Sequence, residues 1–202
     1  MFVFVYSTVI DRLLRDIRIY VPKFCGMEAG NRVLDVCCGT GDQALHYARE
    51  GIIATGIDLN TGMIQVAEKN RRKQSLRNVS FQLASALDLP FKDNCFDYAS
   101  ISFALHEKER VARHKIISEM KRVVKKEGAL VFVDLRAPLP QNAYSYLIKS
   151  IELAAGREHF IHFKDYIEQG GLDQLLKENQ LHDKKRDYLK NGNVAMIETR
   201  NV

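Results

Sequence analysis

The sequence predicts an α/β fold in which a mostly parallel, doubly wound sheet of seven strands carries helices on both faces. Short β-branched stretches alternate with longer amphipathic stretches as far as residue 138, which is typical of strand–helix–strand units. Residues 182–200 instead predict two strands around the turn "KNGN", which adds an antiparallel hairpin to the sheet. At 202 residues, the chain has the length of one domain with a sizeable core.

The predicted sheet core alternates five strands with three helices. The apolar segment "RVLDVC" predicts a buried strand, and Gly51 is expected to end the helix that follows it. Thr61 is the expected N-cap of the next helix, Gly128 is expected to end the long basic helix, and Pro138 to end the last parallel strand. The strands are expected at 32–37, 52–58, 78–85, 96–105 and 129–138, and the helices at 42–51, 61–74 and 107–128.

The remaining segments are expected to pack as helices and to stay outside any membrane. Residues 142–156 and 163–180 show helical patterns. The apolar opening "MFVFVYSTVI" has no basic region before it and no cleavage site after it, so a packed helix is expected in place of a signal peptide. No apolar run reaches the roughly 18 residues that a membrane span needs, and a cytoplasmic protein is expected.

Charge does not favour a nucleic-acid partner. The net charge is +5 and the pI is about 9.0, but the Lys and Arg residues are spread along the expected helices and form no single basic tract. There is also no Asn-Pro-Pro-aromatic element of the kind that amino-methylating nucleic-acid enzymes use. A small-molecule partner is therefore expected.

The adjacent cysteines in "VLDVCCGTGDQA" raise the question of a redox or metal site. Cys37 and Cys38 lack the spacing of a CxxC motif, and neighbouring residues at a strand end point their side chains to opposite faces. With Cys25 and Cys95 they are expected to be reduced, buried thiols. The acidic and histidine residues show no spacing typical of a catalytic metal, so no metal site is expected.

The same segment contains a glycine turn, and an acidic residue follows the second strand. Gly39 and Gly41 allow a tight turn and a close approach of a ligand to the backbone, in front of a helix N-terminus. Asp58 follows the next strand, where a carboxylate can accept hydrogen bonds from two ribose hydroxyls. This pair predicts a nucleoside-binding site. Because "GTGDQA" also fits the dinucleotide pattern G-x-G-x-x-A, an NAD-dependent oxidoreductase stays open at this point.

Four segments in order resemble the class I S-adenosylmethionine-dependent methyltransferases, and among them the small-molecule enzymes of ubiquinone and menaquinone biosynthesis. They are "VLDVCCGTGDQA", "GIDLN", "LDLPFKDNCFDYASISFALHE" and "EMKRVVKKEGALVFVD", and the resemblance runs from about residue 30 to 134. Cys37 stands at the first of the family's three alternating glycine positions. The resemblance implies a Rossmann-like fold and S-adenosyl-L-methionine as the cofactor, with S-adenosyl-L-homocysteine as the product.

The resemblance also implies which residues hold the cofactor. Asp58 would hold the ribose hydroxyls, and the turn would face the methionine portion. Many relatives have an aspartate after the third strand for the adenine, but this chain has Ser85 there and Asp88 three residues on, and both stay open. The expected cofactor-binding residues are Asp35, Cys37, Gly39, Thr40, Gly41, Asp58, Leu59, Ser85, Ala86, Ser102 and Phe103.

Methyl transfer from a sulfonium mainly requires alignment of the reacting atoms, and a general base helps when the acceptor is a hydroxyl or an activated carbon. His106 follows the fourth strand and is the first candidate base, and His159 in "GREHFIHF" is another. The acceptor atom is expected to be O, N, S or activated C. Two alternatives remain: an NAD-dependent oxidoreductase, and a module that binds S-adenosylmethionine without catalysis.

We expect one methyltransferase domain over residues 1–202. Within it, residues 1–29 form an N-terminal helical lid, 30–135 the cofactor-binding core, 136–180 a helical substrate cover and 181–202 the hairpin. The cover contains the aromatic residues Tyr144, Tyr146, Phe160, Phe163 and Tyr166, which suit either an acceptor pocket or a helical core face. A homodimer is left open.

Overall fold

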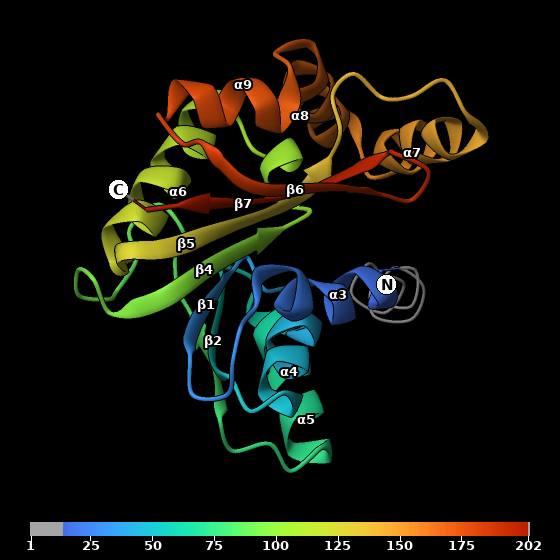
Figure 1. The fold of residues 1–202 in the computed structure, drawn as a ribbon. Helices are drawn as coiled ribbons and strands as arrows, with labels where there is room; N and C mark the ends of the chain where they lie inside the picture. The colour runs from blue at the N-terminus through green and yellow to red at the C-terminus, as the bar shows by residue number, and fades with distance from the viewer. Residues whose placement is uncertain (1–13, 202) are drawn as a thin grey trace.

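A seven-stranded mixed sheet forms the centre of the molecule, as the sequence predicted. The computed structural model describes residues 14–201 (Figure 1). The strands lie in the order β3-β2-β1-β4-β5-β7-β6. Five of them are parallel, and β7 and β6 pair antiparallel beyond β5. They span β1 Arg32–Val36, β2 Ile53–Asp58, β3 Val79–Leu83, β4 Phe96–Ser102, β5 Val124–Leu135, β6 Asp183–Leu189 and β7 Val194–Arg200.

Helices cover both faces of the sheet, as expected for a doubly wound fold. Figure 1 shows α3, α4 and α5 on one side and α6, α8 and α9 on the other. The helices span α3 Arg15–Cys25, α4 Asp42–Arg49, α5 Thr61–Lys73, α6 Arg110–Val123, α7 Ala143–Ala154, α8 Arg157–Glu168 and α9 Gly171–Glu178, with a 3₁₀ turn η2 at Leu105–Glu107. None of the helices in residues 14–201 is long and apolar enough to cross a membrane.

Each face of the sheet has its own hydrophobic core. Val33 of β1 packs with Leu45 and Tyr47 of α4 on one side. Leu34, the next residue along β1, packs with Ile117 of α6 and Tyr166 of α8 on the other. This alternation follows from the two-residue period of a strand. A strand with buried residues on both sides reads as a continuous apolar run, which explains why β1 could be recognised from sequence.

Several predicted boundaries were wrong. The long helix ends at Val123, and residues up to Gly128 belong to β5, which begins at Val124 and ends at Leu135. Val124 pairs with Phe96 of β4, and this pairing outweighs the helical pattern. The N-cap of α5 is Asn60, whose side chain accepts the N–H groups of residues 62 and 63, and Thr61 is the first helical residue.

The helical pattern at 163–180 covers parts of two helices. It breaks at Gly170 and Gly171, which have φ angles of 91° and 60°, in the left-handed region that favours glycine. α8 begins at Arg157, earlier than the pattern indicated, and α9 begins at Gly171. The hairpin forms as predicted, with β6 and β7 joined by residues 190–193.

Candidate active site

An open cleft lies at the carboxyl ends of the parallel strands. Its volume is about 630 Å³, within the usual range for small-molecule sites. In a doubly wound sheet, ligands bind where the strand order reverses, and here β1 lies between β2 and β4. The cleft is lined by Cys37, Gly39, Ile57, Asp58, Leu59, Asn60, Met63, Ala84, Ser85, Ala86, Leu87, Ser102, Phe103, Ala104, Glu107, Lys108, Ala112 and Ile116.

The turn after β1 reverses the backbone by alternating residues in the left-handed region. Cys37, Gly39 and Gly41 have φ angles of 56°, 53° and 77°. A side chain at Gly41 would also place its Cβ 2.5 Å from Cζ of Phe81. Glycine is the residue that adopts such angles without strain, so the structure explains the alternating glycine pattern. Cys37 adopts a left-handed φ although it has a side chain, so the turn still forms with cysteine at this position.

Asp58 joins the end of β2 to this turn. Its Oδ2 accepts the N–H of Gly39 at 2.9 Å, and its Oδ1 accepts the N–H of Asn60 at 2.8 Å. Each carboxylate oxygen has a second lone pair, and the side chain lines the cleft beside Leu59, which is 69% exposed. A carboxylate with two free acceptor positions at the cleft wall fits a diol such as a ribose.

The loop after β3 distinguishes the two residues considered for the adenine. Ser85 and Ala86 line the cleft, whereas Asp88 is exposed and does not belong to the lining. The Ser85 hydroxyl accepts the N–H of Leu87 at 3.1 Å, which holds the loop in a tight turn. The geometry therefore favours Ser85 and the neighbouring backbone over Asp88.

Three of the expected cofactor residues lie behind the turn, outside the cleft lining. Asp35 is buried and accepts a hydrogen bond from the Ser100 hydroxyl at 3.1 Å. Burial raises the pKa of Asp35 to about 7, and the Ser100 hydrogen bond and the charge of Arg18 oppose this increase. Thr40 and Gly41 are also buried. From these positions, Asp35, Thr40 and Gly41 can stabilise the conformation of the turn, and they do not line the cleft.

The end of β4 forms the opposite wall of the cleft. Ser102 and Phe103 line it as expected, and Phe103 has a left-handed φ of 52°. Glu107 and Lys108 were not predicted from the sequence, and their side chains lie 3.8 Å apart in the same wall. The signal that could have identified them in the sequence is their position directly after the candidate base His106.

His106 lies behind this wall in a cluster of ionisable side chains. Its Nδ1 is 2.5 Å from Oδ1 of Asp134, at the end of β5, and its Nε2 is 3.7 Å from Oε1 of Glu152 on α7. His159 of α8 contacts the other oxygen of Glu152 at 2.5 Å. The structure thus brings both candidate bases together, although neither belongs to the cleft lining.

The charge of His106 bears on its expected role. Burial disfavours the protonated form, but the Asp134 carboxylate outweighs this effect and, with Glu152 and Glu107, raises the pKa of His106 to about 9. A protonated imidazole cannot accept a proton from an acceptor. The base role of His106 and His159 stays a prediction that this arrangement does not favour.

The expected cover and lid contribute nothing to the cleft lining within residues 14–201, since the lining residues run from 37 to 116. Phe163 and Tyr166 are buried in the core, whereas Tyr146 is 70% exposed. In the expected lid, residues 1–13 lie outside the described residues. The rest of it includes α3, whose Arg18 forms a 2.8 Å ion pair with Asp42 of α4. The lid and cover roles stay predictions.

All four cysteines are unpaired, in agreement with reduced thiols. The expectation that all four are buried was wrong, because only Cys25 is fully buried and the other three are partly exposed. Burial raises the pKa of Cys37 to about 12 and also raises that of Cys38, so both thiols are protonated and weakly reactive at neutral pH. Cys37 lines the cleft and Cys38 does not, as expected for neighbours at a strand end.

Comparison with known proteins agrees with this geometry. Residues 33–128 match the family described as "Methyltransferase domain". A demethylmenaquinone methyltransferase from Listeria welshimeri is 36% identical over 120 residues, which are 57% of this chain and 50% of that protein. One from Oceanobacillus iheyensis is 30% identical over 151 residues, 71% of this chain and 62% of that protein. The chain thus spans about half the length of the first of these relatives.

Solved structures share the fold at low sequence identity. A methyltransferase from Aquifex aeolicus, described as SAM dependent, has a TM-score of 0.69 and 19% identity, with coverage of 92% of this chain and 89% of that one. Geranyl diphosphate C-methyltransferase from Streptomyces coelicolor, in complex with Mg²⁺, geranyl diphosphate and S-adenosyl-L-homocysteine, has a TM-score of 0.69 and 16% identity, with coverage of 95% and 80%. Over residues 33–128 the chain is thus similar to methyltransferase domains, and the expected resemblance to the class I S-adenosylmethionine-dependent methyltransferases is confirmed.

Proposed function

We propose that the chain transfers a methyl group from S-adenosyl-L-methionine to an O, N, S or activated C atom of a small molecule. The observation that carries this proposal is the contact between Asp58 and Gly39 at the edge of the cleft. It places a diol-accepting carboxylate beside a turn whose backbone a ligand can approach. The matched methyltransferase domain covers this site.

The residues of the cleft supply binding and alignment. When bound, the cofactor supplies an electrophilic methyl group on a sulfonium, and S-adenosyl-L-homocysteine is the product. Asp58 would hold the ribose, Ser85 and Ala86 the adenine, and the turn at Gly39 the methionine portion. Ser102 and Phe103, at the end of β4, would position the acceptor opposite. The acceptor atom is the nucleophile that displaces the sulfur, and alignment of the reacting atoms can contribute about 7–11 kcal/mol, so this step requires no nucleophile from the protein.

The first acceptors to test are hydroquinones related to demethylmenaquinone, because the curated relatives carry that name. Such acceptors have an activated ring carbon next to a hydroxyl group. The largely apolar wall of Phe103, Ala112 and Ile116 suits a flat apolar ring. A panel of phenols, amines and thiols would cover the other acceptor classes.

A radiolabelled methyl-transfer assay tests the proposal against both alternatives. The protein is incubated with methyl-labelled S-adenosylmethionine and each acceptor, and product label and S-adenosylhomocysteine are quantified together. Equal amounts of the two are expected. Binding of S-adenosylmethionine without turnover across the panel would favour the non-catalytic module. Binding of NAD in its place would favour the oxidoreductase.

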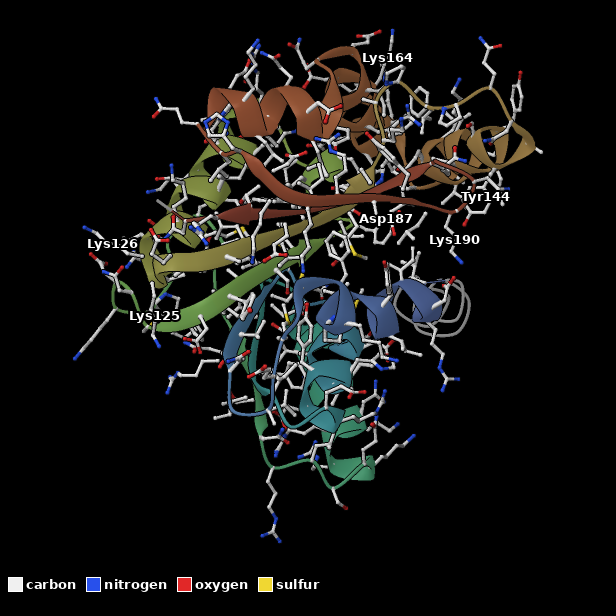
Figure 2. All side chains as sticks on the ribbon, in the orientation of Figure 1. Lys125, Lys126, Tyr144, Lys164, Asp187 and Lys190 are labelled. Atoms are coloured by element: carbon white, nitrogen blue, oxygen red, sulfur yellow. The ribbon has the colours of Figure 1, made fainter. Side chains whose placement is uncertain are left out.

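The expected setting of the protein is part of the proposal. Four unpaired cysteines suit the reducing cytoplasm, where cell fractionation should find the protein. The lysines labelled in Figure 2 lie on different elements: Lys125 and Lys126 in the first residues of β5, Lys164 on α8 and Lys190 in the loop between β6 and β7. This spread supports a small-molecule partner over nucleic acid. Light scattering would determine whether the chain forms the homodimer that the sequence leaves open.

A further inference from the structure

Three side chains from separate elements meet behind the cleft. They are His106 of η2, Glu152 of α7 and His159 of α8, and one ligand atom from each lies within 4.8 Å of the others. Their side chains are 5%, 10% and 22% exposed. Two imidazoles and one carboxylate in a partly closed site form a donor set that binds divalent first-row metals.

The orientation of His106 is fixed by a carboxylate that is not part of this set. Asp134 contacts its Nδ1 at 2.5 Å and also accepts the backbone N–H groups of Leu105 and His106, at 3.0 and 3.3 Å. Nε2 is thereby directed toward Glu152, 3.7 Å away. Metal-binding histidines almost always make this second contact, because it fixes the tautomer and the ring and makes the ligand nitrogen more basic.

The charge of the cluster supports a cation. Asp134 and Glu152 are both buried, and in the described part of the chain their ion pairs are with His106 and His159 only. No lysine or arginine side chain forms an ion pair with either carboxylate in residues 14–201. A buried carboxylate is costly unless it is paired or binds a metal, and with both imidazoles neutral as metal ligands, a divalent ion would compensate the two carboxylates.

We propose that His106 Nε2, Glu152 and His159 Nε2 bind a divalent transition metal of the Zn²⁺ class, which displaces the proton from Nε2 of His106 into solvent, with Asp134 as the positioning residue. Three protein ligands leave a fourth position for water or a ligand oxygen. The site links the end of β4, through η2, to α7 and α8. The metal therefore holds the helices of segment 136–180 against the sheet edge beside the cleft. This site is independent of the proposed methyl transfer.

The test uses the full chain, stripped of metal with a chelator, and Zn²⁺ as the probe. Elemental analysis after desalting should find one Zn²⁺ per chain, and calorimetry against a competing chelator gives the affinity. Co²⁺ provides a second readout, because its ligand-field absorption reports nitrogen and oxygen ligands and differs from that of thiolate ligands.

Matched variants assign the binding to these residues. His159→Gln and Glu152→Gln should each weaken Zn²⁺ binding at least about 100-fold, and Asp134→Asn about 10–100-fold. His162→Gln, on the same helix, and Cys37→Ser with Cys38→Ser should leave it within about threefold of wild type. Circular dichroism of the metal-free variants checks that each is folded.

Two results would overturn the proposal. One is a folded wild-type chain that takes up less than one Zn²⁺ per chain at micromolar metal. In that case the cluster only joins the helices to the sheet edge by hydrogen bonds and ion pairs. The other is Zn²⁺ binding that persists in His159→Gln and Glu152→Gln but is lost when Cys37 and Cys38 are replaced.

Discussion

The carboxyl edge of the sheet has a first wall, at β1 and β2, and a second wall, at β4 and β5 with the side-chain cluster behind it, and the two are built in different ways. At β1 and β2, backbone N–H groups and left-handed turn residues form an open cleft around one carboxylate, Asp58. At β4 and β5, the side chains of His106, Asp134 and Glu152 form a buried cluster closed by α7 and α8. The first wall depends on backbone shape and the second on charge, so substitutions should affect them differently.

The largest effect is expected from removing charge at the second wall. In metal-free protein, Asp134→Asn should lower the free energy of unfolding by about 3–5 kcal/mol, because it leaves the buried His106 without its carboxylate. Urea denaturation followed by circular dichroism gives this value. Asp88→Asn, at an exposed carboxylate, is the control and should change it by less than about 0.5 kcal/mol. A loss below about 1 kcal/mol for Asp134→Asn would mean that the cluster does not hold the wall together.

Backbone shape at the first wall should give the next largest effect. Gly41→Ala combines a left-handed φ of 77° with a Cβ placed 2.5 Å from Phe81, so a loss of about 2–4 kcal/mol is expected. Gly30 has a similar φ of 89° but open space around it, and Gly30→Ala should lose only about 1–2 kcal/mol. Chemical denaturation of the Gly41→Ala and Gly30→Ala variants gives the two losses in unfolding free energy, and their difference is the contribution of the contact with Phe81. Equal losses would show that Phe81 moves aside without cost.

A pH-dependent effect, smaller per pH unit than the losses above, is expected from Asp35, which lies beneath the first wall. Its folded pKa of about 7 is above the unfolded value of about 3.8, so between these pH values the folded state keeps a proton that the unfolded state has released. Relative to Asp35→Asn, the wild-type chain should therefore lose about 1.4 kcal/mol of stability per pH unit from about pH 4 to 7, and no more above that. Unfolding curves of both proteins from pH 4.5 to 8.5 measure this difference. A difference that does not change with pH would contradict the raised pKa.

Sequence predicted the first wall better than the second for a physical reason. Gly39 and Asp58 lie within one strand–helix–strand unit, where local pattern fixes both the elements and their order. Asp134, Glu152 and His159 come from three elements whose packing no local period encodes, and the sequence spacing therefore indicated no metal site. The boundary at Val123 and Val124 was missed because valine fits either a helical stripe or a strand, and only the pairing with β4 decides.

Calorimetric titration with S-adenosyl-L-homocysteine tests most directly whether the first wall is the cofactor site. Asp58→Ala should weaken binding at least about tenfold relative to wild type, consistent with the loss of a charged hydrogen bond worth about 1.5–3 kcal/mol, while Asp88→Ala should stay within about twofold. Unchanged affinity in folded Asp58→Ala, or a wild-type chain that binds NAD but not S-adenosyl-L-homocysteine, would contradict the account.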